Sequence, residues 1–328
     1  MPIIISVMKK RNKKIIAALS AIFGLLVIGA LCWSFVLCYR TLHPPRLTDL
    51  SWLTRQYPHT TEWLDSIRSN GLLHDIVRLN ADGERLHARW LWAPEPTEKT
   101  AVLFHGYQGS AETMLMIGYL FNHDFGFNVL IPDLRGHGQS EPSAISMGWT
   151  ERTEVVDWIR TADSLFGGNT QIVLYGVSMG AATTMIAAAE ESLPACVRCA
   201  VEDCGYTSTR DIFADSWEKQ CRLPLFPLFH LSDLWCRILY GWSFAKASPL
   251  DAVHRCRLPM LFIHGDKDSV VPVEMVHRLY EAKIGDKELW ILSGVDHGAA
   301  YLHDPQIYAQ RVRTFVEHWF ECPAILEQ

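Results

Sequence analysis

The sequence predicts an α/β fold in which a mostly parallel central sheet has helices on both faces and follows an N-terminal transmembrane helix. Two patterns predict this architecture. Short apolar strands alternate with helical segments from residue 100 onward, and a long apolar run without charges lies near the N-terminus. The chain has 328 residues, of which 49% are hydrophobic and 20% charged, so it has enough apolar material for a sizeable core. The same composition excludes a disordered chain.

The N-terminal segment has the features of a membrane anchor. Residues 15–39 form a run of 25 residues without a charge, and roughly 20 apolar residues suffice for a helix to cross a bilayer. Trp33 and Tyr39 lie toward its C-terminal end, where aromatic rings favour the membrane interface. We predict a basic cytoplasmic tail at 1–14, an anchor at 15–39, and a linker with one short helix at 40–72.

The distribution of basic residues predicts the orientation of this anchor. Five basic residues precede the apolar run, whereas only Arg40, Arg46 and Arg55 follow it within about 20 residues, which places the rest of the chain outside the cytoplasm. A cleaved signal peptide is the alternative. The run exceeds the ~7–15 residues of a signal-peptide core and no clear Ala-x-Ala site follows it, so we favour an uncleaved anchor in the cell membrane.

Charge and cysteine usage argue against a nucleic acid partner and against a cysteine metal or redox site. The first forty residues contain six basic and no acidic residues, which leaves 24 basic against 36 acidic residues in 41–328. This part of the chain would repel phosphate backbones, so we expect no nucleic acid partner. The Cys196-x-x-Cys199 pair resembles a metal or redox motif, but it lies in an apolar run with no second pair, which favours buried thiols.

Residues 73–322 are expected to form one domain that opens with a hairpin. Residues 76–79 and 86–90 alternate in polarity around an Asp82-Gly83 turn, as two antiparallel strands do. Apolar runs predict six further strands, at 101–104, 128–131, 171–175, 196–202, 259–263 and 288–292. Helices are expected near 110–122, 151–166, 179–190, 272–283 and 305–320.

One interval interrupts the alternation of strands and helices. More than fifty residues separate the strand ending near 202 from the strand starting near 259, far more than a strand–helix connection needs. Aromatic residues are frequent there: Phe213, Trp217, Phe226, Phe229, Trp235, Tyr240, Trp242 and Phe244. We predict a helical cap at about 207–250 over the carboxyl edge of the sheet. An extra buried helix pair without a functional role is the alternative.

A serine motif lies at the centre of the predicted sheet. Gly176-Val177-Ser178-Met179-Gly180 matches G-x-S-x-G, directly after an apolar strand and before a helix-forming segment. The glycines allow a sharp turn, which exposes the serine hydroxyl at the helix N-terminus. The pattern therefore predicts Ser178 as a nucleophile.

A nucleophilic serine needs a base to accept its proton and an acid to hold the base in the right tautomer. His297 directly follows the last predicted strand, whereas His303 and His318 belong to the last helix, so we expect His297 to be the base. The order Ser178, Asp268, His297 is the order of the triad in α/β-hydrolases.

Three aspartates compete for the role of the acid. Asp203 follows an earlier strand, Asp266 directly follows Gly265, and Asp268 lies two residues further along the same loop. We expect Asp266 to hydrogen-bond within its own turn and Asp268 to reach the loop of His297.

Two backbone N–H groups are expected to stabilise the oxyanion that forms when the serine attacks. One is that of Met179, the residue after the nucleophile, and the other that of Tyr107, in a glycine-containing turn after the first parallel strand. An ordinary strand-ending turn is the alternative for the second site.

With these motifs, the chain from about residue 73 to 320 resembles an α/β-hydrolase. The motifs follow the order of that family: His105-Gly106, the segment 133–140 (DLRGHGQS), the elbow at Ser178, the segment 264–268 (HGDKD) and His297. The chain is most similar to the membrane-anchored bacterial branch of cell-surface, serine-aminopeptidase-like hydrolases, in which a segment like 201–208 precedes the cap.

The resemblance implies a serine hydrolase of esters, thioesters or small amides that works through an acyl-enzyme, without a metal or an organic cofactor. The aromatic-rich cap favours apolar acyl or aryl groups, so we expect carboxylesterase or lipase-like activity on a small ester-like substrate. The alternatives are a serine peptidase or amidase of the same fold and a non-catalytic ligand-sensing protein.

Overall fold

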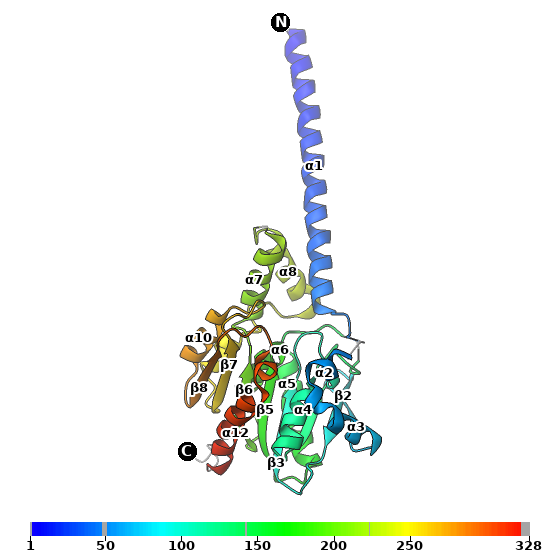
Figure 1. Ribbon diagram of the computed structural model, residues 1–328. Helices are drawn as coiled ribbons and strands as arrows, with labels where there is room; N and C mark the ends of the chain where they lie inside the picture. Colours follow the sequence, from blue (N-terminus) through cyan, green and yellow to red (C-terminus); the bar gives the residue numbers. More distant parts are fainter. Residues whose placement is uncertain (1, 48–50, 142, 223, 323–328) are drawn as a thin grey trace. The chain divides into compact units, whose positions relative to one another are not determined.

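The computed structural model describes residues 2–47, 51–141, 143–222 and 224–322 (Figure 1). The chain divides into two compact units. The smaller unit contains the residues up to Thr41 together with Trp217–Ser243, and the larger unit contains Leu42–Ser216 and the residues from Phe244 onward.

The larger unit is built on an eight-stranded sheet with the order β1-β2-β4-β3-β5-β6-β7-β8. β1 (His74–Leu79) and β2 (Arg85–Leu91) form an antiparallel hairpin, and β2 also runs antiparallel to β4 (Asn128–Pro132). All other pairs are parallel, and they involve β3 (Lys99–Phe104), β5 (Gln171–Val177), β6 (Val197–Asp203), β7 (Met260–Gly265) and β8 (Lys287–Leu292). The predicted mostly parallel sheet with an antiparallel opening is confirmed.

Helices connect these strands. The five in the predicted positions are α4 (Leu115–Tyr119), α5 (Glu151–Leu165), α6 (Met179–Ala187), α10 (Val273–Ala282) and α12 (Pro305–Glu321). Three more are short: α2 (Ser51–Gln56), α9 (Pro249–Val253) and α11 (Ala300–His303). The helix expected at 110–122 is divided into a 3-10 turn (Glu112–Met114), α4 and a π turn (Leu120–Asp124). The predicted linker contains α2, a 3-10 turn (Pro58–Thr60) and α3 (Thr61–Ser69), so it holds more helix than expected.

Both faces of the sheet are buried. Alternate residues of the central strands, such as Leu103, Tyr175 and Val201, form one core cluster with side chains of α3, α4 and α12. Residues of the opposite alternation, such as Val102 and Leu174, are equally buried. Helices α5, α6 and α10 contact the strands and contribute no residue to the first cluster, so they cover the second face.

The smaller unit consists of α1 (Pro2–Leu42) up to Thr41, the end of α7 (Thr209–Cys221) and α8 (Leu228–Tyr240). α1 runs without interruption through the predicted basic tail and anchor, so the boundary at residue 14 is one of charge and not of conformation. Its stretch Asn12–Leu42 contains an 18-residue window with a mean hydropathy of 2.7 and is long enough to cross a membrane. The predicted cap interval 207–250 is helical, and its middle part belongs to this smaller unit.

Local sequence signals explain where several helices begin and end. The Asp304 carboxylate accepts a hydrogen bond from the N–H of Ile307 (3.0 Å) at the start of α12, and Pro305 occupies the first turn. At the start of α9, the Ser248 hydroxyl accepts a hydrogen bond from the N–H of Asp251 (3.1 Å), and Pro249 occupies the first turn. α8 ends at Gly241, whose φ of 73° lies in the left-handed region that favours glycine.

Candidate active site

Ser178 occupies a strained turn between β5 and α6. Its φ of 55° and ψ of −116° lie in a region that residues other than glycine rarely adopt. A Cβ added to Gly176 would overlap the carbonyl group of Gly180, and one added to Gly180 would overlap the carbonyl oxygen of Phe104. The glycines of the motif are therefore required for the close approach of backbone segments that forms the turn.

The structure brings the three residues of the predicted triad together. His297 Nε2 lies 2.9 Å from Ser178 Oγ, and His297 Nδ1 lies 2.7 Å from Asp268 Oδ2. Because a carboxylate only accepts hydrogen bonds, Nδ1 donates to Asp268 and Nε2 is left to accept from the serine hydroxyl. The Asp268 side chain is fully buried, and the His297 side chain is 19% exposed.

Several donors fix the Asp268 carboxylate. Its Oδ1 accepts hydrogen bonds from the N–H groups of Val270 (2.9 Å) and Val271 (2.7 Å). His264 Nε2 lies 3.3 Å from Asp268 Oδ2 and also donates to the carbonyl oxygen of Val271 (3.0 Å). Burial lowers the pKa of His264, so this imidazole is neutral near pH 7.

Asp296, which the sequence analysis did not single out, joins the two loops that carry the acid and the base. Its Oδ1 accepts hydrogen bonds from the N–H of His297 (2.7 Å) and from both the N–H (2.8 Å) and the hydroxyl of Ser269 (2.8 Å). These hydrogen bonds lower the pKa of Asp296. Its position next to the predicted base in the sequence was the available signal.

The other two aspartates have different partners. Asp203 lies at the end of β6 and accepts hydrogen bonds from the hydroxyl groups of Tyr308 (2.7 Å) and Tyr175 (3.3 Å). Burial raises the pKa of the Asp203 carboxyl to about 6, although both tyrosine hydroxyls oppose that shift.

Asp266 accepts hydrogen bonds from the N–H of Gly294 (2.6 Å) and the hydroxyl of Ser293 (3.2 Å). The expectation that Asp266 bonds within its own turn is therefore wrong. Gly265 passes so close to the backbone of Val295 that the carboxylate of the next residue reaches the loop after β8 instead.

The segments that carry the expected oxyanion donors lie beside the serine. β3 and β5 are parallel neighbours, and Phe104 pairs with Gly176 at their carboxyl ends. A Cβ built on Gly106 would lie 3.3 Å from the Cβ of Ser178, so the loop before Tyr107 touches the nucleophile. Met179 is the first residue of α6, where the N–H groups have no partner within the helix.

Two buried histidines hold the loop that contains Tyr107. His137 Nε2 accepts a hydrogen bond from the N–H of Gln108 (3.2 Å), while its Nδ1 donates to the carbonyl oxygen of Arg135 (2.9 Å). His105 Nδ1 donates to the carbonyl oxygen of Gly106 (2.8 Å), and its Nε2 accepts from the N–H of Leu134 (2.9 Å).

Burial lowers the pKa of both histidines, that of His105 to about 3, so both imidazoles are neutral and accept hydrogen bonds at Nε2. Neither histidine was assigned a role from the sequence, although both lie in the quoted motifs.

A second set of contacts connects the same loops through Asp133. Its Oδ1 accepts from the N–H of Ala111 (2.6 Å), and its Oδ2 accepts from the N–H of Gln139 (2.9 Å) and from His87 Nδ1 (2.7 Å). His87 Nε2 is bonded in turn to Asp75 (2.6 Å) in the edge hairpin. Burial lowers the pKa of His87, but the two carboxylates outweigh burial and leave this pKa raised.

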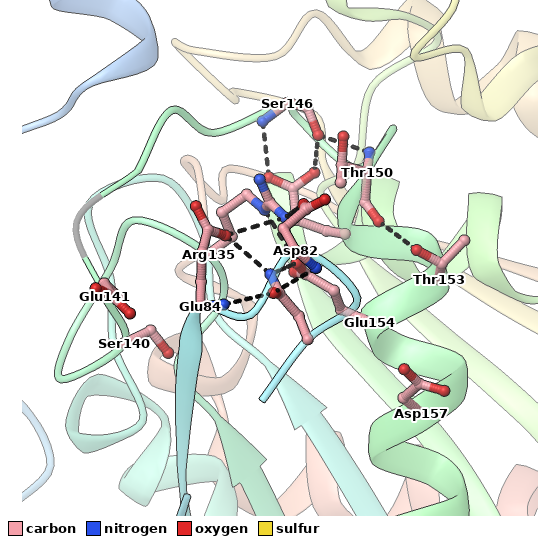
Figure 2. Close-up of polar contacts among 12 residues, drawn as sticks. Asp82, Glu84, Arg135, Ser140, Glu141, Ser146, Thr150, Thr153, Glu154 and Asp157 are labelled. Carbon is pink, nitrogen blue, oxygen red and sulfur yellow. Dashed lines mark hydrogen bonds and ion pairs between the residues drawn. The ribbon is translucent and has the colours of Figure 1, made fainter. Parts of the chain in front are cut away.

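Arg135 anchors the segment 133–140 from the other side (Figure 2). Its guanidinium bonds to Glu154 Oε1 of α5 at 3.0 and 2.8 Å and pairs with Asp82 (2.9 Å) and Glu84 (3.2 Å). Glu154 is nearly buried, and burial raises its pKa although Arg135 opposes the shift. The carbonyl of Arg135 therefore has a fixed position from which to orient His137.

One group of potential metal ligands lies at the site. Ligand atoms of Cys204, Asp268 and His297 all lie within 4.8 Å of one another. Asp268 and His297 already share a hydrogen bond of 2.7 Å, so they are committed to each other. Of the pair singled out earlier, Cys199 is buried and Cys196 half-buried, and burial raises the pKa of Cys196 to about 11.

Comparisons with known proteins point to one family. A family model described as the alpha/beta hydrolase family matches residues 101–311. The chain is 30% identical over 226 residues to the uncharacterized protein YqkD of Bacillus subtilis (strain 168). The alignment covers 69% of this chain and 73% of that protein. It is 26% identical over 238 residues to the uncharacterized membrane protein YNL320W of Saccharomyces cerevisiae (strain ATCC 204508 / S288c). That alignment covers 72% of this chain and 76% of that protein.

Solved structures show the same fold. The esterase Pf2001 of Pyrococcus furiosus aligns with a TM-score of 0.65 and 21% sequence identity, over 86% of this chain and 98% of that chain. At this level of identity the likeness concerns the fold, and the chemistry has to be argued from the residues of this chain.

Proposed function

The chain belongs to the alpha/beta hydrolase family and is a hydrolase; from this premise we propose that it cleaves esters or thioesters through an acyl-enzyme on Ser178. One observation carries the proposal. A continuous hydrogen-bond chain runs from Ser178 Oγ through His297 to the buried Asp268, with distances of 2.9 and 2.7 Å. This is the arrangement in which an imidazole removes the proton of a serine hydroxyl.

The proposed reaction begins when Ser178 Oγ attacks the carbonyl carbon of the ester and His297 Nε2 takes the hydroxyl proton. Asp268 holds Nδ1–H and stabilises the imidazolium that forms. The N–H groups of Met179 and Tyr107 donate to the oxyanion of the tetrahedral intermediate. The intermediate collapses when His297 returns its proton to the leaving alcohol or thiol, which leaves an acyl group on Ser178.

Deacylation repeats these steps with water as the nucleophile. His297 Nε2 accepts a proton from water, the hydroxide attacks the acyl carbon, and the proton passes to Ser178 Oγ as the acid product leaves. Each step uses only the side chains and N–H groups of this chain, so the reaction needs no metal or organic cofactor.

The substrate class follows from two supporting points. The interval 207–250 is rich in aromatic residues, of which Phe213 and Phe244 belong to the larger unit with Ser178, and aromatic side chains favour apolar acyl or aryl groups. The aligned protein of Pyrococcus furiosus is named an esterase. We propose a carboxylesterase or lipase-like enzyme with small ester-like substrates.

Reaction with a fluorophosphonate probe tests the nucleophile, and turnover of p-nitrophenyl esters of increasing chain length tests the substrate class. The wild-type chain should be labelled and turn over these esters, and Ser178→Ala should do neither. A chain that hydrolyses aminoacyl amides faster than esters would be a peptidase, and a chain that is labelled without any turnover would be a ligand-sensing protein.

We also propose that α1 anchors the enzyme in the cell membrane, with its N-terminus in the cytoplasm and the hydrolase unit outside. The apolar stretch Asn12–Leu42 and the basic residues before it support this proposal, and a yeast relative is named a membrane protein. A reporter that is active only outside the cytoplasm should function when fused after residue 328. Activity of a cytoplasm-only reporter at the same position would refute the orientation.

A further inference from the structure

Small side chains form part of the contact between α1 and α8. Ser34 and Cys38 lie four residues apart on α1, and Ser232 and Cys236 lie four residues apart on α8. These four side chains are between 0% and 6% exposed. Small residues at this spacing on two facing helices allow the backbones to approach closely, and such contacts are typical of helix pairs within membranes.

Polar groups at this contact are satisfied within the helix pair. The Ser232 hydroxyl donates to the carbonyl oxygen of Ser34 (3.1 Å). The indole N–H of Trp235 lies 3.2 Å from both the carbonyl oxygen of Leu31 and the Ser34 hydroxyl, and that hydroxyl itself donates to Leu31 O (3.0 Å). Internal satisfaction of this kind is a requirement in hydrocarbon, where no water replaces a missing partner.

The opposite face of α8 exposes apolar side chains. Leu234 and Ile238 lie one turn apart and are 46% and 62% exposed. The neighbouring charge at Arg237 is neutralised by Asp233, whose Oδ2 lies 2.6 Å from the guanidinium. A helix that contacts a partner through small residues and turns leucine and isoleucine outward presents a surface that fits lipid.

The position of the contact along α1 places it at one border of a bilayer. The apolar stretch Asn12–Leu42 has 31 residues and rises about 46 Å at 1.5 Å per residue, whereas the hydrocarbon core is about 30 Å thick. Lys13 and Lys14 hold its start at the cytoplasmic surface and the next charge is Arg40, so the span ends between Ser34, about 20 residues on, and Arg40. Trp235 contacts α1 at this level, where indole rings favour the interface.

We propose that α8 is a membrane helix that lies in the leaflet at the C-terminal end of α1, with Leu234 and Ile238 against lipid acyl chains. The inference rests on the proposed anchor and is independent of the proposed catalysis. Its partner is the lipid bilayer. The middle of the interval 207–250, which belongs to the smaller unit, is then part of the membrane-bound region of the protein.

Photocrosslinking to lipid tests the proposal in the full chain. The photoreactive residue p-benzoylphenylalanine replaces Ile238, and in separate variants it replaces Phe23 of α1 or Leu79 of β1. Leu79 is a matched control because it is 61% exposed, like Ile238, but lies on the edge hairpin of the larger unit. Each variant is reconstituted in vesicles of phosphatidylcholine and phosphatidylglycerol and irradiated, and adducts are identified by mass spectrometry. Equal melting temperatures verify that the variants are folded.

We expect lipid adducts at positions 23 and 238 and none at position 79. A lipid adduct at 23 together with none at 238, or with a protein crosslink at 238, overturns the placement of α8 and leaves the anchor intact. The absence of an adduct at position 23 means that α1 does not span the bilayer and refutes the anchor itself. Adducts at 79 as well as 238 show nonspecific adsorption to the vesicles and also overturn the proposal. Labelling of Ser178 has no part in this readout, so the catalytic proposal is tested separately.

Discussion

Two carboxylates at the ends of neighbouring strands have different surroundings. Asp203 at the end of β6 accepts hydrogen bonds from two tyrosine hydroxyls, and burial raises its pKa to about 6. Asp268 in the loop after β7 accepts from two backbone N–H groups and from His297 Nδ1. Both are buried aspartates at the same edge of the sheet, so position alone does not determine the role of a carboxylate. The hydrogen-bond donors around each carboxylate distinguish the two.

The different surroundings of Asp203 and Asp268 matter for catalysis only if Ser178 is the nucleophile. Ser178→Ala removes the attacking oxygen, and we expect kcat to fall by up to the order of 10⁶ and leave only the contribution of the oxyanion donors. Hydrolysis of p-nitrophenyl esters measures this loss. Turnover near the wild-type value would show that neither carboxylate supports a serine nucleophile here.

Asp268→Asn tests the assignment of the acid directly. The amide keeps the shape of the side chain but can hold the wrong imidazole tautomer of His297, and we expect a loss on the order of 10⁴ in kcat. Asp203→Asn and Asp266→Asn are the matched controls and should change mainly stability or KM. If folded Asp268→Asn keeps more than about a tenth of the wild-type kcat, a deficit below ~1.4 kcal/mol, the assignment fails. It passes to Asp203 if Asp203→Asn alone loses activity.

The raised pKa of Asp203 should make the free energy of unfolding depend on pH. Its pKa of about 6 in the folded protein lies above the ordinary value of 3.8, so the folded state binds this proton more tightly than the unfolded state. The corresponding stabilisation is fully present below about pH 4 and is lost as the pH rises through about 6, a change of about 3 kcal/mol.

Asp203→Asn removes this titration. Between pH 3 and pH 7 its unfolding free energy should therefore fall by about 3 kcal/mol less than that of the wild type. Urea denaturation at several pH values measures the difference. Parallel curves for the two proteins would contradict the raised pKa, and Asp266→Asn serves as the control aspartate.

The smallest effect is expected on the oxyanion side of the site. His137→Ala removes the acceptor for Gln108 N–H, which loosens the loop of Tyr107, and we expect kcat to fall on the order of tenfold with little change in KM. This is less than the ~10²–10³ that the loss of a donor itself costs. His137→Gln restores an acceptor and should recover part of the rate. His123→Ala, at an exposed histidine paired with Asp124, is the control. A change in KM alone would indicate that His137 affects substrate binding and not the transition state.

The parts of the molecule that could be predicted are those that short sequence patterns encode. The two hairpin strands follow alternating polarity and the other strands follow apolar runs, and all lie within a few residues of the predicted ranges. Ser178, Asp268 and His297 could be proposed as a triad because each lies in the turn or loop after a strand, where the carboxyl ends of parallel strands meet, and the structure places their side chains within hydrogen-bond distance. The helix at 110–122 was less predictable because Met114, Leu115 and Phe121 are all buried, so no exposed face fixes its period.

The supporting contacts could not be predicted because they join distant parts of the chain. Gln108 and His137 are 29 positions apart, as are His105 and Leu134. The hydrogen bond between Ser232 and Ser34 spans 198 positions. A local pattern contains no information about such pairs, and the motif 133–140 indicated family resemblance without indicating which atoms its histidine would hold.

Three neighbouring strands end near residues with left-handed backbone conformations: Gln108 after β3, Ser178 after β5 and Cys204 after β6, with φ of 62°, 55° and 52°. None is a glycine, and each such conformation costs of the order of 1–3 kcal/mol that the rest of the fold must offset. The tolerance of this protein to mutation is therefore uneven along the chain. Destabilising substitutions elsewhere reduce the folding free energy that holds these three turns in their strained conformations. Substitutions that relieve the strain at the turns should raise thermal stability and lower activity.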